Sequence, residues 1–209
     1  MSTFPRRIPL FPLPDVVLFP KIPLPLHVYE PRYQKMVRDV LEGHGIIGMT
    51  LLEPGWETDY EGRPPVYGIG CAGRLERCDP LEHGRFDVVI RGLIRFRILE
   101  EHSGEPYRQA TVQPLVDQAG DPALLQAARG KALAAIARAN DGPSVLVLQD
   151  QLPYDLFVNA LCQSLSLLPL ERQSLLACNS ILTRCLRLIE ILEFKRLEQA
   201  CGGAGQTVH

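Results

Sequence analysis

Apolar residues and prolines interleave from residue 8 to residue 33 with almost no polar break. Proline lacks the amide donor and fixes φ, so it breaks helical ladders, and within sheets it is confined to edges and bulges. The stretch contains seven prolines, and the six that precede Pro31 are Pro9, Pro12, Pro14, Pro20, Pro23 and Pro25. The apolar residues between them still favour burial. The pattern predicts an extended, kinked ribbon, neither helix nor central strand, that wraps a β-rich core.

Between residues 45 and 115 the pattern changes to short apolar runs separated by turn residues, which is typical of strands. The runs span residues 45–52, 66–77, 85–91, 93–101 and 107–115. Apolar and polar residues alternate in the third and fourth runs, which predicts one buried face and one wetter face carrying Arg95 and Arg97. Gly92 indicates either a bend between two strands or a bulge within one long strand. Residues 82–84 favour a hairpin turn.

One helix interrupts these runs, from about Pro31 to Leu41, and Gly43 ends it. Pro31 suits the first turn, where its missing amide costs no hydrogen bond. The side expected to face the core carries Tyr33, Met36, Val37, Val40 and Leu41. Glu30 and Arg32 flank Pro31, and capping of the helix or an internal ion pair is favoured over a functional pair.

The segment from residue 53 to residue 65 is acidic, rich in proline and glycine, and carries the only tryptophan of the chain, Trp56. Such a segment is expected to form a surface loop, and binding groups are often found on loops. Tyr60 adds a second aromatic side chain to this loop.

The second half of the chain follows a helical pattern, because the first 120 residues hold 14 of the 18 prolines and 12 of the 17 glycines. Asp121 and Pro122 predict the start of a helix that continues through Ile136. Further helices are predicted over 153–168 and from Pro169. An apolar seam typical of a bundled last helix follows at Leu175, Cys178, Leu182, Cys185, Ile189 and Leu192.

The start of this last helix has two interpretations. Asn179 either interrupts the helix or caps its entry, and the seam is also compatible with one unbroken helix from about residue 171 to residue 199. The glycine-rich segment 202–209 is predicted to be a disordered tail.

Composition narrows the class of protein. A chain of 209 residues with 46 % hydrophobic residues has enough apolar material for a packed core. A net charge of −2 argues against nucleic acid as the main ligand. There is no run of 18 apolar residues and no apolar leader segment at the N-terminus, so a soluble, cytoplasmic protein without a membrane partner is expected.

The residues also favour a protein without catalytic chemistry. The six cysteines lack the spacing of a zinc knuckle, and Cys178 and Cys185 are interpreted as small buried hydrophobes. The G-x-G-x-x-G spacing at 68–73 falls within an apparent strand, so glycines at close backbone crossings are favoured over a dinucleotide site. No nucleophile, acid or base cluster is recognisable. We predict no catalytic residue, no metal site and no cofactor.

Three stretches nevertheless carry a family resemblance: residues 8–33, residues 68–74, and residues 84–97 with Arg91-Gly92 and Arg95-Phe96-Arg97. With Leu167-Leu-Pro-Leu170 in the helical half, the chain resembles the N-terminal, substrate-binding domain of the ATP-dependent Lon proteases. The resemblance implies an α+β fold, a PUA-like β pseudo-barrel with one inserted helix followed by an α-helical bundle. The expected limits are 1–118 for the barrel and 119–201 for the bundle.

The same resemblance implies a role in recognising polypeptides. The ATPase and peptidase parts of Lon proteases lie downstream of this domain, so no catalytic residue is carried over to this chain. The motif residues are interpreted as architectural; they are Pro20, Pro25, Glu30, Pro31, Arg32, Tyr33 and Gly92.

The leading hypothesis is a non-enzymatic module that binds unfolded polypeptide or a partner protein. Its candidate binding residues are Trp56, Tyr60, His27 and Tyr67. A first alternative is an adaptor that docks through Arg184, Arg187 and Arg196 of the helical half, although a solvated face with pairs such as Arg187 and Glu190 is the simpler interpretation. A second is an RNA or small-molecule binder that uses the barrel. The sequence does not indicate an oligomeric state.

Overall fold

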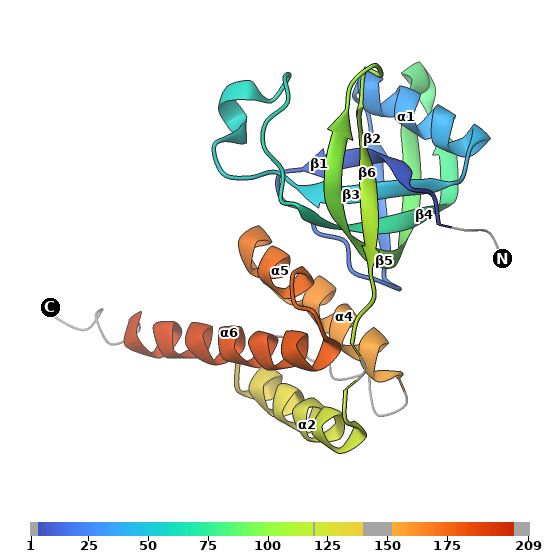
Figure 1. The fold of residues 1–209 in the computed structure, drawn as a ribbon. Helices are drawn as coiled ribbons and strands as arrows, with labels where there is room; N and C mark the ends of the chain where they lie inside the picture. Colours follow the sequence, from blue (N-terminus) through green and yellow to red (C-terminus); the bar gives the residue numbers. More distant parts are fainter. Residues whose placement is uncertain (1–3, 119, 140–151, 203–209) are drawn as a thin grey trace, which may run out of the picture. The chain divides into compact units, whose positions relative to one another are not determined.

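A computed structural model describes residues 4–118, 120–139 and 152–202. The chain divides into two compact units, Met1–Val116 and Asp117–His209, which we call the strand unit and the helical unit. Among the described residues the strand unit holds six strands and helix α1, and the helical unit holds four further α-helices (Figure 1). The α+β class expected from the sequence is confirmed.

The strands of the strand unit close into a ring. They are β1 (Arg7–Leu13), β2 (Pro23–Val28), β3 (Ile46–Leu51), β4 (Ile69–Pro80), β5 (Phe86–His102) and β6 (Arg108–Leu115). Their order is β2-β5-β4-β3-β1-β6, and β6 pairs back onto β5. Only the β1–β3 pairing is parallel among these neighbours. Strand β2 therefore extends the ring at β5 and has one free edge.

The long strand β5 contains a bulge. One edge of β5 pairs with β4 on both sides of the bulge, and the other edge pairs with β2 before the bulge and with β6 after it. The register with β4 shifts where Ala72 faces Ile94 and Gly73 faces Gly92, which leaves Leu93 as the extra residue. A bulge bends a strand and increases its twist. Of the two interpretations of Gly92, the bulge within one strand is confirmed.

Strand β1 corrects the prediction for the proline-rich ribbon, because it is paired on both sides. Its first half, including Pro9, pairs with β6, and its second half, including Pro12, pairs with β3. Only Leu10 is paired with both neighbours. Pro9 and Pro12 are thus each paired with a neighbouring strand on one side only. This staggered pairing lets a strand with missing amide donors lie inside a closed sheet.

The ribbon between β1 and β2 crosses the β5 bulge. The amide of Lys21 donates to the carbonyl of Gly92 at 2.8 Å, and the amide of Gly92 donates to Ile22 at 3.0 Å. A Cβ added at Gly92 would lie 2.1 Å from the carbonyl oxygen of Phe19, so only glycine fits this crossing. Phe19 itself is fully buried.

The core of the strand unit lies inside the ring. Its central cluster is Ile8, Leu10, Ile46, Ala72, Phe96, Ala110 and Val112. Arg95 is 1 % exposed, so the prediction of a wetter face at this position is wrong. Arg95 and Phe96 are consecutive and both buried, and consecutive strand residues point to opposite faces. Both faces of β5 are therefore covered at this point.

Helix α1 spans Pro31–Glu42 and packs on strand β1. Tyr33, Met36, Val37 and Val40 are buried as expected. The Tyr33 ring lies 4.5 Å from the ring of Phe11. Leu41 is 54 % exposed, so its assignment to the inner side is wrong. With 3.6 residues per turn, Leu41 falls at the edge of the apolar stripe formed by Tyr33, Met36, Val37 and Val40.

The helical unit contains α2 (Pro122–Ala139), α4 (Tyr154–Ser164), α5 (Pro169–Leu176) and α6 (Ile181–Gly202). Asp121 caps α2, since its carboxylate accepts from the amides of Ala123 and Leu124. Helix α4 ends before the predicted limit, because Leu165 is extended. The single helix over 171–199 is wrong, because residues 177–180 separate α5 from α6.

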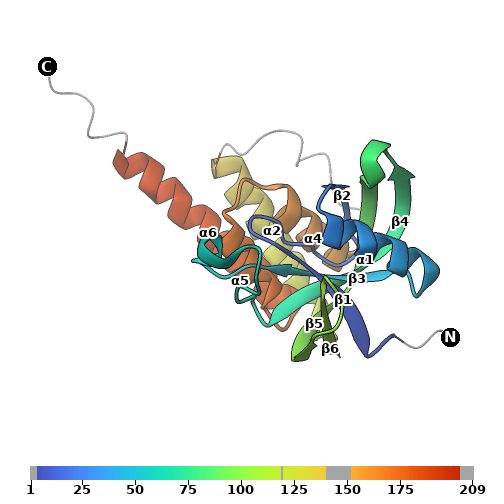
Figure 2. The same ribbon diagram turned by 90° about the horizontal axis from the view of Figure 1, so that it is seen from above.

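Ser180, rather than Asn179, caps α6 by accepting from the amide of Thr183 at 3.1 Å. The buried seam of α6 is also shifted from the predicted one. Ile181, Cys185, Leu188 and Leu192 are buried, whereas Leu182 and Ile189 are half-buried. The C-terminal part of α6 extends beyond the other three helices of its unit (Figures 1 and 2), which is consistent with its exposed Phe194 and Leu197.

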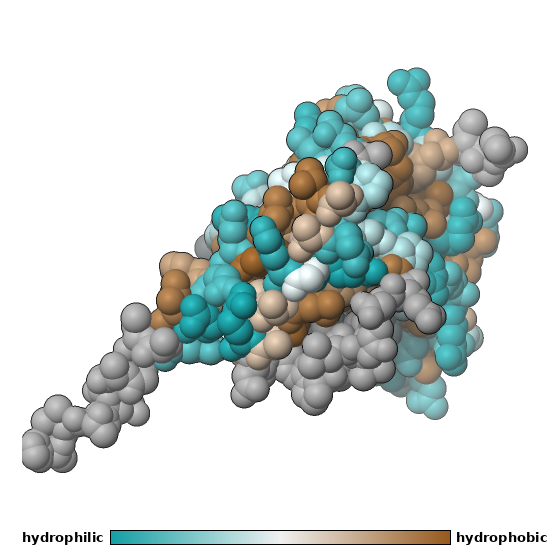
Figure 3. All heavy atoms as spheres, turned by 90° about the horizontal axis from the view of Figure 1, so that it is seen from below, coloured by the Kyte–Doolittle hydropathy of each residue, from teal (hydrophilic) through white to brown (hydrophobic). Residues whose placement is uncertain are grey.

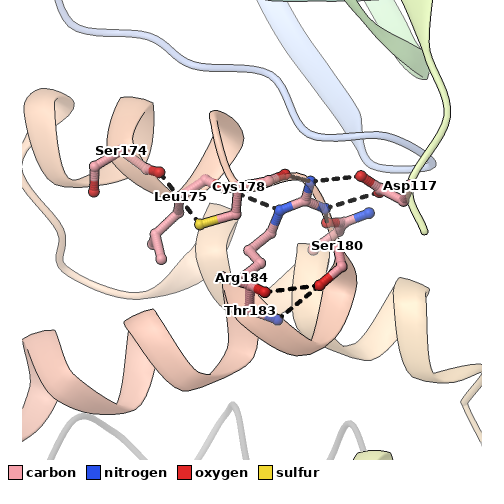
Figure 4. A network of polar contacts seen from close by, with 8 residues as sticks. Asp117, Ser174, Leu175, Cys178, Ser180, Thr183 and Arg184 are labelled. Atoms are coloured by element: carbon pink, nitrogen blue, oxygen red, sulfur yellow. Dashed lines mark hydrogen bonds and ion pairs between the residues drawn. The ribbon is translucent and has the colours of Figure 1, made fainter. Parts of the chain in front are cut away.

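Arg184 is the polar centre of the helical unit (Figure 4). Its side chain is fully buried and makes an ion pair with Asp117 at 3.2 Å. It also donates to the side chain of Asn159 at 2.6 Å and to the carbonyl of Leu175 at 3.0 Å. One guanidinium therefore joins α4, the end of α5, α6 and the segment that enters the unit.

On the face shown in Figure 3, apolar residues gather in small patches between hydrophilic ones. Among the described helices, none has both the length and the apolar character that crossing a membrane requires. The Asn-Asp-Gly-Pro sequence at 140–143 also predicts the end of α2, but these residues and residues 203–209 of the predicted tail lie outside the described residues.

Candidate functional site

Two neighbouring hollows of the strand unit share Tyr33 and Tyr60 as lining residues. The first, which we call the aromatic groove, has a volume of about 380 Å³ and is lined by Phe11, Leu13, Pro14, Asp15, His27, Val28, Tyr29, Glu30, Tyr33, Trp56 and Tyr60. The second, the arginine pocket, has about 320 Å³ and is lined by Pro12, Arg32, Tyr33, Leu52, Tyr60, Glu61, Gly62, Arg63, Pro64, Glu105, Pro106, Tyr107 and Arg108.

Three of the four candidate binding residues meet in the aromatic groove. His27 comes from the end of β2, and Trp56 and Tyr60 come from the loop after β3, which stands out from the strands in Figure 1. Trp56 begins the 3-10 helix η1 (Trp56–Asp59) of this loop. Tyr67 does not line the groove; its backbone amide donates to Leu51 at 2.9 Å.

Sequence reasoning missed Tyr29, whose side chain is 62 % exposed and lines the groove. Its ring stacks on His27 with centroids 6.3 Å apart. Consecutive residues of an extended segment point to opposite sides, so a buried Val28 implies that the side chain of Tyr29 points outward. This alternation could have identified Tyr29 from the sequence. Phe11 and Asp15 were also missed, because the groove brings the end of β1 beside a loop more than 40 residues away.

The Glu30 carboxylate fixes the loop against the start of α1. Glu30 precedes the helix in an extended conformation and makes no capping hydrogen bond with its side chain. Instead, its Oε2 accepts from Nε of Arg32 at 2.9 Å, and its Oε1 accepts from the hydroxyl of Tyr60 at 2.5 Å. Of the two interpretations for Glu30 and Arg32, the structure shows the ion pair.

Arg32 continues this connection. Its guanidinium lies 4.8 Å from the ring centroid of Tyr33 and 5.1 Å from that of Tyr60, within the range of cation–π attraction. Its terminal nitrogens also donate to the carbonyl of Tyr60 at 3.4 Å. Burial and the hydrogen bond to Glu30 raise the pKa of Tyr60 to about 12. Tyr60 is therefore a neutral donor at physiological pH.

The aromatic walls of the groove are held by contacts within the strand unit. Trp56 and Tyr60 meet edge to face at 5.4 Å. The His27 ring is held as well, because its Nδ1 lies 2.8 Å from the carboxylate of Asp87 on β5. Rings fixed in this way lose little side-chain entropy when a ligand covers them.

The arginine pocket is closed by bonds between the loop and the β5–β6 hairpin. Arg108 makes two bonds to Glu101, at 2.8 and 2.6 Å, and a third to the carbonyl of Pro64 at 2.6 Å. Arg63 donates to the carbonyl of His102 at 3.4 Å. The loop that carries Trp56 is therefore anchored at both of its sides, by Arg32 and by Arg108.

The remaining candidate chemistry is structural. In the described part of the chain, no three His, Cys, Asp or Glu residues are grouped so that they would hold a metal ion. Burial raises the pKa of the Cys162 and Cys185 thiols, which opposes thiolate formation. Gly70 of the G-x-G-x-x-G spacing lies within β4, and a Cβ there would be 2.4 Å from the carbonyl of Met49. The spacing marks a close strand crossing, as predicted.

The helical docking face predicted at Arg184, Arg187 and Arg196 is wrong in its first member. Arg184 is fully buried, because it binds Asp117 and Asn159 inside the unit. Arg187 instead pairs with Glu190 at 3.0 Å on the surface of α6, and Arg196 pairs with Glu193 at 3.2 Å. This is the solvated face with local ion pairs.

Comparison with protein families gives a match over residues 7–193 to the ATP-dependent protease La (LON) substrate-binding domain. The Lon protease of Flavobacterium johnsoniae is 25 % identical over 204 residues, which are 93 % of this chain and 25 % of that protein. Lon protease 2 of Myxococcus xanthus is 28 % identical over 71 % of this chain and 17 % of its own length. The chain thus spans a quarter or less of these relatives.

Two solved structures share the fold. The crystal structure of a Lon N-terminal domain protein from Xanthomonas campestris has a TM-score of 0.61 at 23 % identity, covering 88 % of this chain and 97 % of that one. The N-terminal domain of the Lon protease from the Mycobacterium avium complex has a TM-score of 0.70 at 15 % identity, with coverages of 90 % and 98 %.

Proposed function

The chain belongs to the Lon substrate-binding domain family, and from this premise we propose that it is a non-enzymatic module that binds an extended segment of unfolded polypeptide in the aromatic groove. The family description supports binding of protein substrates in general. The location of the site and the unfolded state of the ligand are our proposal.

One observation carries the proposal: exposed and half-exposed rings from two distant segments line one groove beside a free strand edge. His27 lies at the end of β2 and Tyr29 directly follows this strand, whereas Trp56 and Tyr60 lie in the loop after β3. Aromatic side chains supply large contact areas at low entropic cost, and such side chains dominate binding energies at interfaces. An extended chain that lays apolar side chains between these walls needs no catalytic group.

The groove is a better binding place than the free edge of β2. Strand β2 pairs with β5 on one side only, so its other edge is open in the sheet order. Pro23 and Pro25 lie on this strand. Proline offers no amide donor, and prolines on edge strands oppose the addition of a further strand. We therefore assign affinity to side-chain contacts in the groove rather than to backbone pairing.

We also propose the finer architecture that the resemblance implied. The closed ring of strands is a PUA-like pseudo-barrel, and the four described helices after it form a bundle with its limit near residue 118. The structural motif residues then serve the barrel: Gly92 admits the ribbon at Phe19, and Glu30 with Arg32 fastens the loop.

Fluorescence anisotropy of a dye-labelled, permanently unfolded polypeptide tests the proposal. Saturable binding is expected for the full chain, and Trp56→Ala and Tyr29→Ala should each weaken it about tenfold, since interface aromatics often contribute more than about 1 kcal/mol. Leu99→Ala is the matched control, because Leu99 is 57 % exposed on β5 but does not line the groove. Equal affinities for all four proteins would reject the groove as the site.

A further inference from the structure

We infer that the aromatic groove selects a basic side chain, lysine or arginine, within the polypeptide segment that it binds. The inference rests on the proposed function and adds the class of residue that the groove recognises. It follows from the charges that line the groove, from the separation of those charges from the neighbouring arginines, and from the arrangement of the rings.

The ionisable side chains of the groove favour a cation. Two carboxylates line it, those of Asp15 and Glu30, whereas no lysine or arginine is among its described lining residues. Asp15 is exposed and makes no ion pair with another described residue, so its charge is available to a ligand. The charge of Glu30 is balanced by Arg32, 2.8 Å away, so a cationic side chain entering the groove is attracted mainly by the exposed carboxylate of Asp15.

The two members of the Glu30–Arg32 ion pair line different hollows. Glu30 lines the aromatic groove only, and Arg32 lines the arginine pocket only, although their charged groups lie 2.8 Å apart. Tyr33 and Tyr60 form the wall between them. Arg63 and Arg108 also line the arginine pocket, together with Glu61 and Glu105, so its described lining carries one more positive than negative side chain, whereas that of the groove carries carboxylates and no lysine or arginine.

The rings supply the second attraction. Four rings line the groove in two contacting pairs, His27 with Tyr29 and Trp56 with Tyr60. Ring faces attract lysine and arginine, most strongly in the case of tryptophan, and aromatic walls with nearby carboxylates are a common receptor for cationic groups. The long methylene stem of a basic residue also packs against apolar walls while its charged end reaches a carboxylate.

Three neutral-dye-labelled peptides test the inference, identical and apolar except for a central lysine, norleucine or glutamate. We expect the lysine peptide to bind about tenfold more tightly than the norleucine peptide, and the glutamate peptide to bind most weakly. The lysine preference should fall as salt is added, because part of it is Coulombic. Norleucine keeps the length of the side chain and removes only its charge.

Asp15→Asn should reduce the lysine-to-norleucine ratio several-fold, while Glu42→Gln, the same charge change at an exposed position outside the groove, should leave it unchanged. Equal affinities for lysine and norleucine would overturn the inference and leave the proposed function standing. Failure of all three peptides, with failure of a long unfolded chain, would reject the proposed function itself. An equal drop of the lysine-to-norleucine affinity ratio in both variants would show that the preference comes from the net charge of the protein. This result would contradict a site for a basic residue in the groove.

Discussion

The hydroxyl of Tyr60 donates a hydrogen bond of 2.5 Å to the Glu30 carboxylate, which stands 30 residues earlier in the chain. The same carboxylate binds Arg32, whose guanidinium lies over the Tyr60 ring. The three side chains form one unit that fixes the Trp56 loop against the start of α1. The motif around Pro31 therefore contributes to the fold and also positions the loop that lines the proposed binding groove.

Tyr60→Phe removes the hydroxyl donor and should lower the free energy of unfolding by about 1 kcal/mol, the usual net value of such a bond. Urea denaturation followed by circular dichroism measures the loss. Glu30 keeps its ion pair with Arg32 in this variant, so the fold should persist. An unchanged midpoint would contradict the structural role of the bond.

The pKa of Tyr60 gives a pH signature of the same contact. Folding raises this pKa from 10 to about 12, mainly through burial, so the unfolded chain loses the proton first. The associated stability is fully present below pH 10 and is lost as the pH rises towards 12. Tyr60→Phe should reduce the slope of stability against pH in this window. Tyr107, raised to about 12, keeps a residual slope in the variant.

Phe19→Ala should lower the free energy of unfolding by about 3 to 5 kcal/mol, because it empties a fully buried site where the ribbon crosses the ring. Leu26→Ala should cost about 1 kcal/mol, since Leu26 is only half-buried on the edge strand. Chemical denaturation of both variants gives the comparison. Polypeptide binding by Phe19→Ala, measured under conditions where it is folded, should match that of the unmodified chain.

Gly92→Ala should destabilise by about 3 kcal/mol or prevent folding, since the added Cβ meets the backbone of Phe19 rather than a side chain that can move. Gly68→Ala is the matched control, because no atom lies within 4 Å of a Cβ there. We expect the control to change stability by less than about 1 kcal/mol. Similar denaturation midpoints for the two variants would contradict the close crossing at Gly92.

Arg184→Met should destabilise the protein by about 3 to 5 kcal/mol, because it leaves the partners of a buried charge without their counterpart. Arg187→Ala should cost less than about 1 kcal/mol, since its ion pair with Glu190 is exposed. Thermal unfolding of both proteins distinguishes the buried arginine from the surface one. A docking role for Arg184 would instead predict normal stability with loss of a partner.

The sequence predicted the elements well where local pattern determines structure. Helix α1 and the helix after Asp121 follow from capping and apolar spacing, and the Gly92 bulge follows from one glycine between alternating runs. Staggered pairing of β1 was not predictable, because Pro9 and Pro12 are tolerated only through partners that lie far along the chain. The burial of Arg95 was not predictable either, because it also depends on strands that lie far along the chain.

The candidate site was predicted in part. The groove is lined by three of the predicted residues, Trp56, Tyr60 and His27. Their exposure was predictable, because loops and edge strands lie at the surface of a protein. Tyr67 lies outside the groove, and Tyr29 was missed despite its exposure. Arg184 looked like a surface cation on a helix, and only the tertiary partners Asp117 and Asn159 make its burial possible.

Trp56 is the only tryptophan of the chain and lines the aromatic groove, so its fluorescence reports directly on the proposed site. The decisive measurement is a titration of the protein with a tryptophan-free, permanently unfolded polypeptide, following Trp56 emission together with the anisotropy of the labelled ligand. We predict that both signals change and saturate at the same ligand concentration. Saturating anisotropy with unchanged Trp56 emission would contradict the groove as the binding site, and no change in either signal would contradict polypeptide binding altogether.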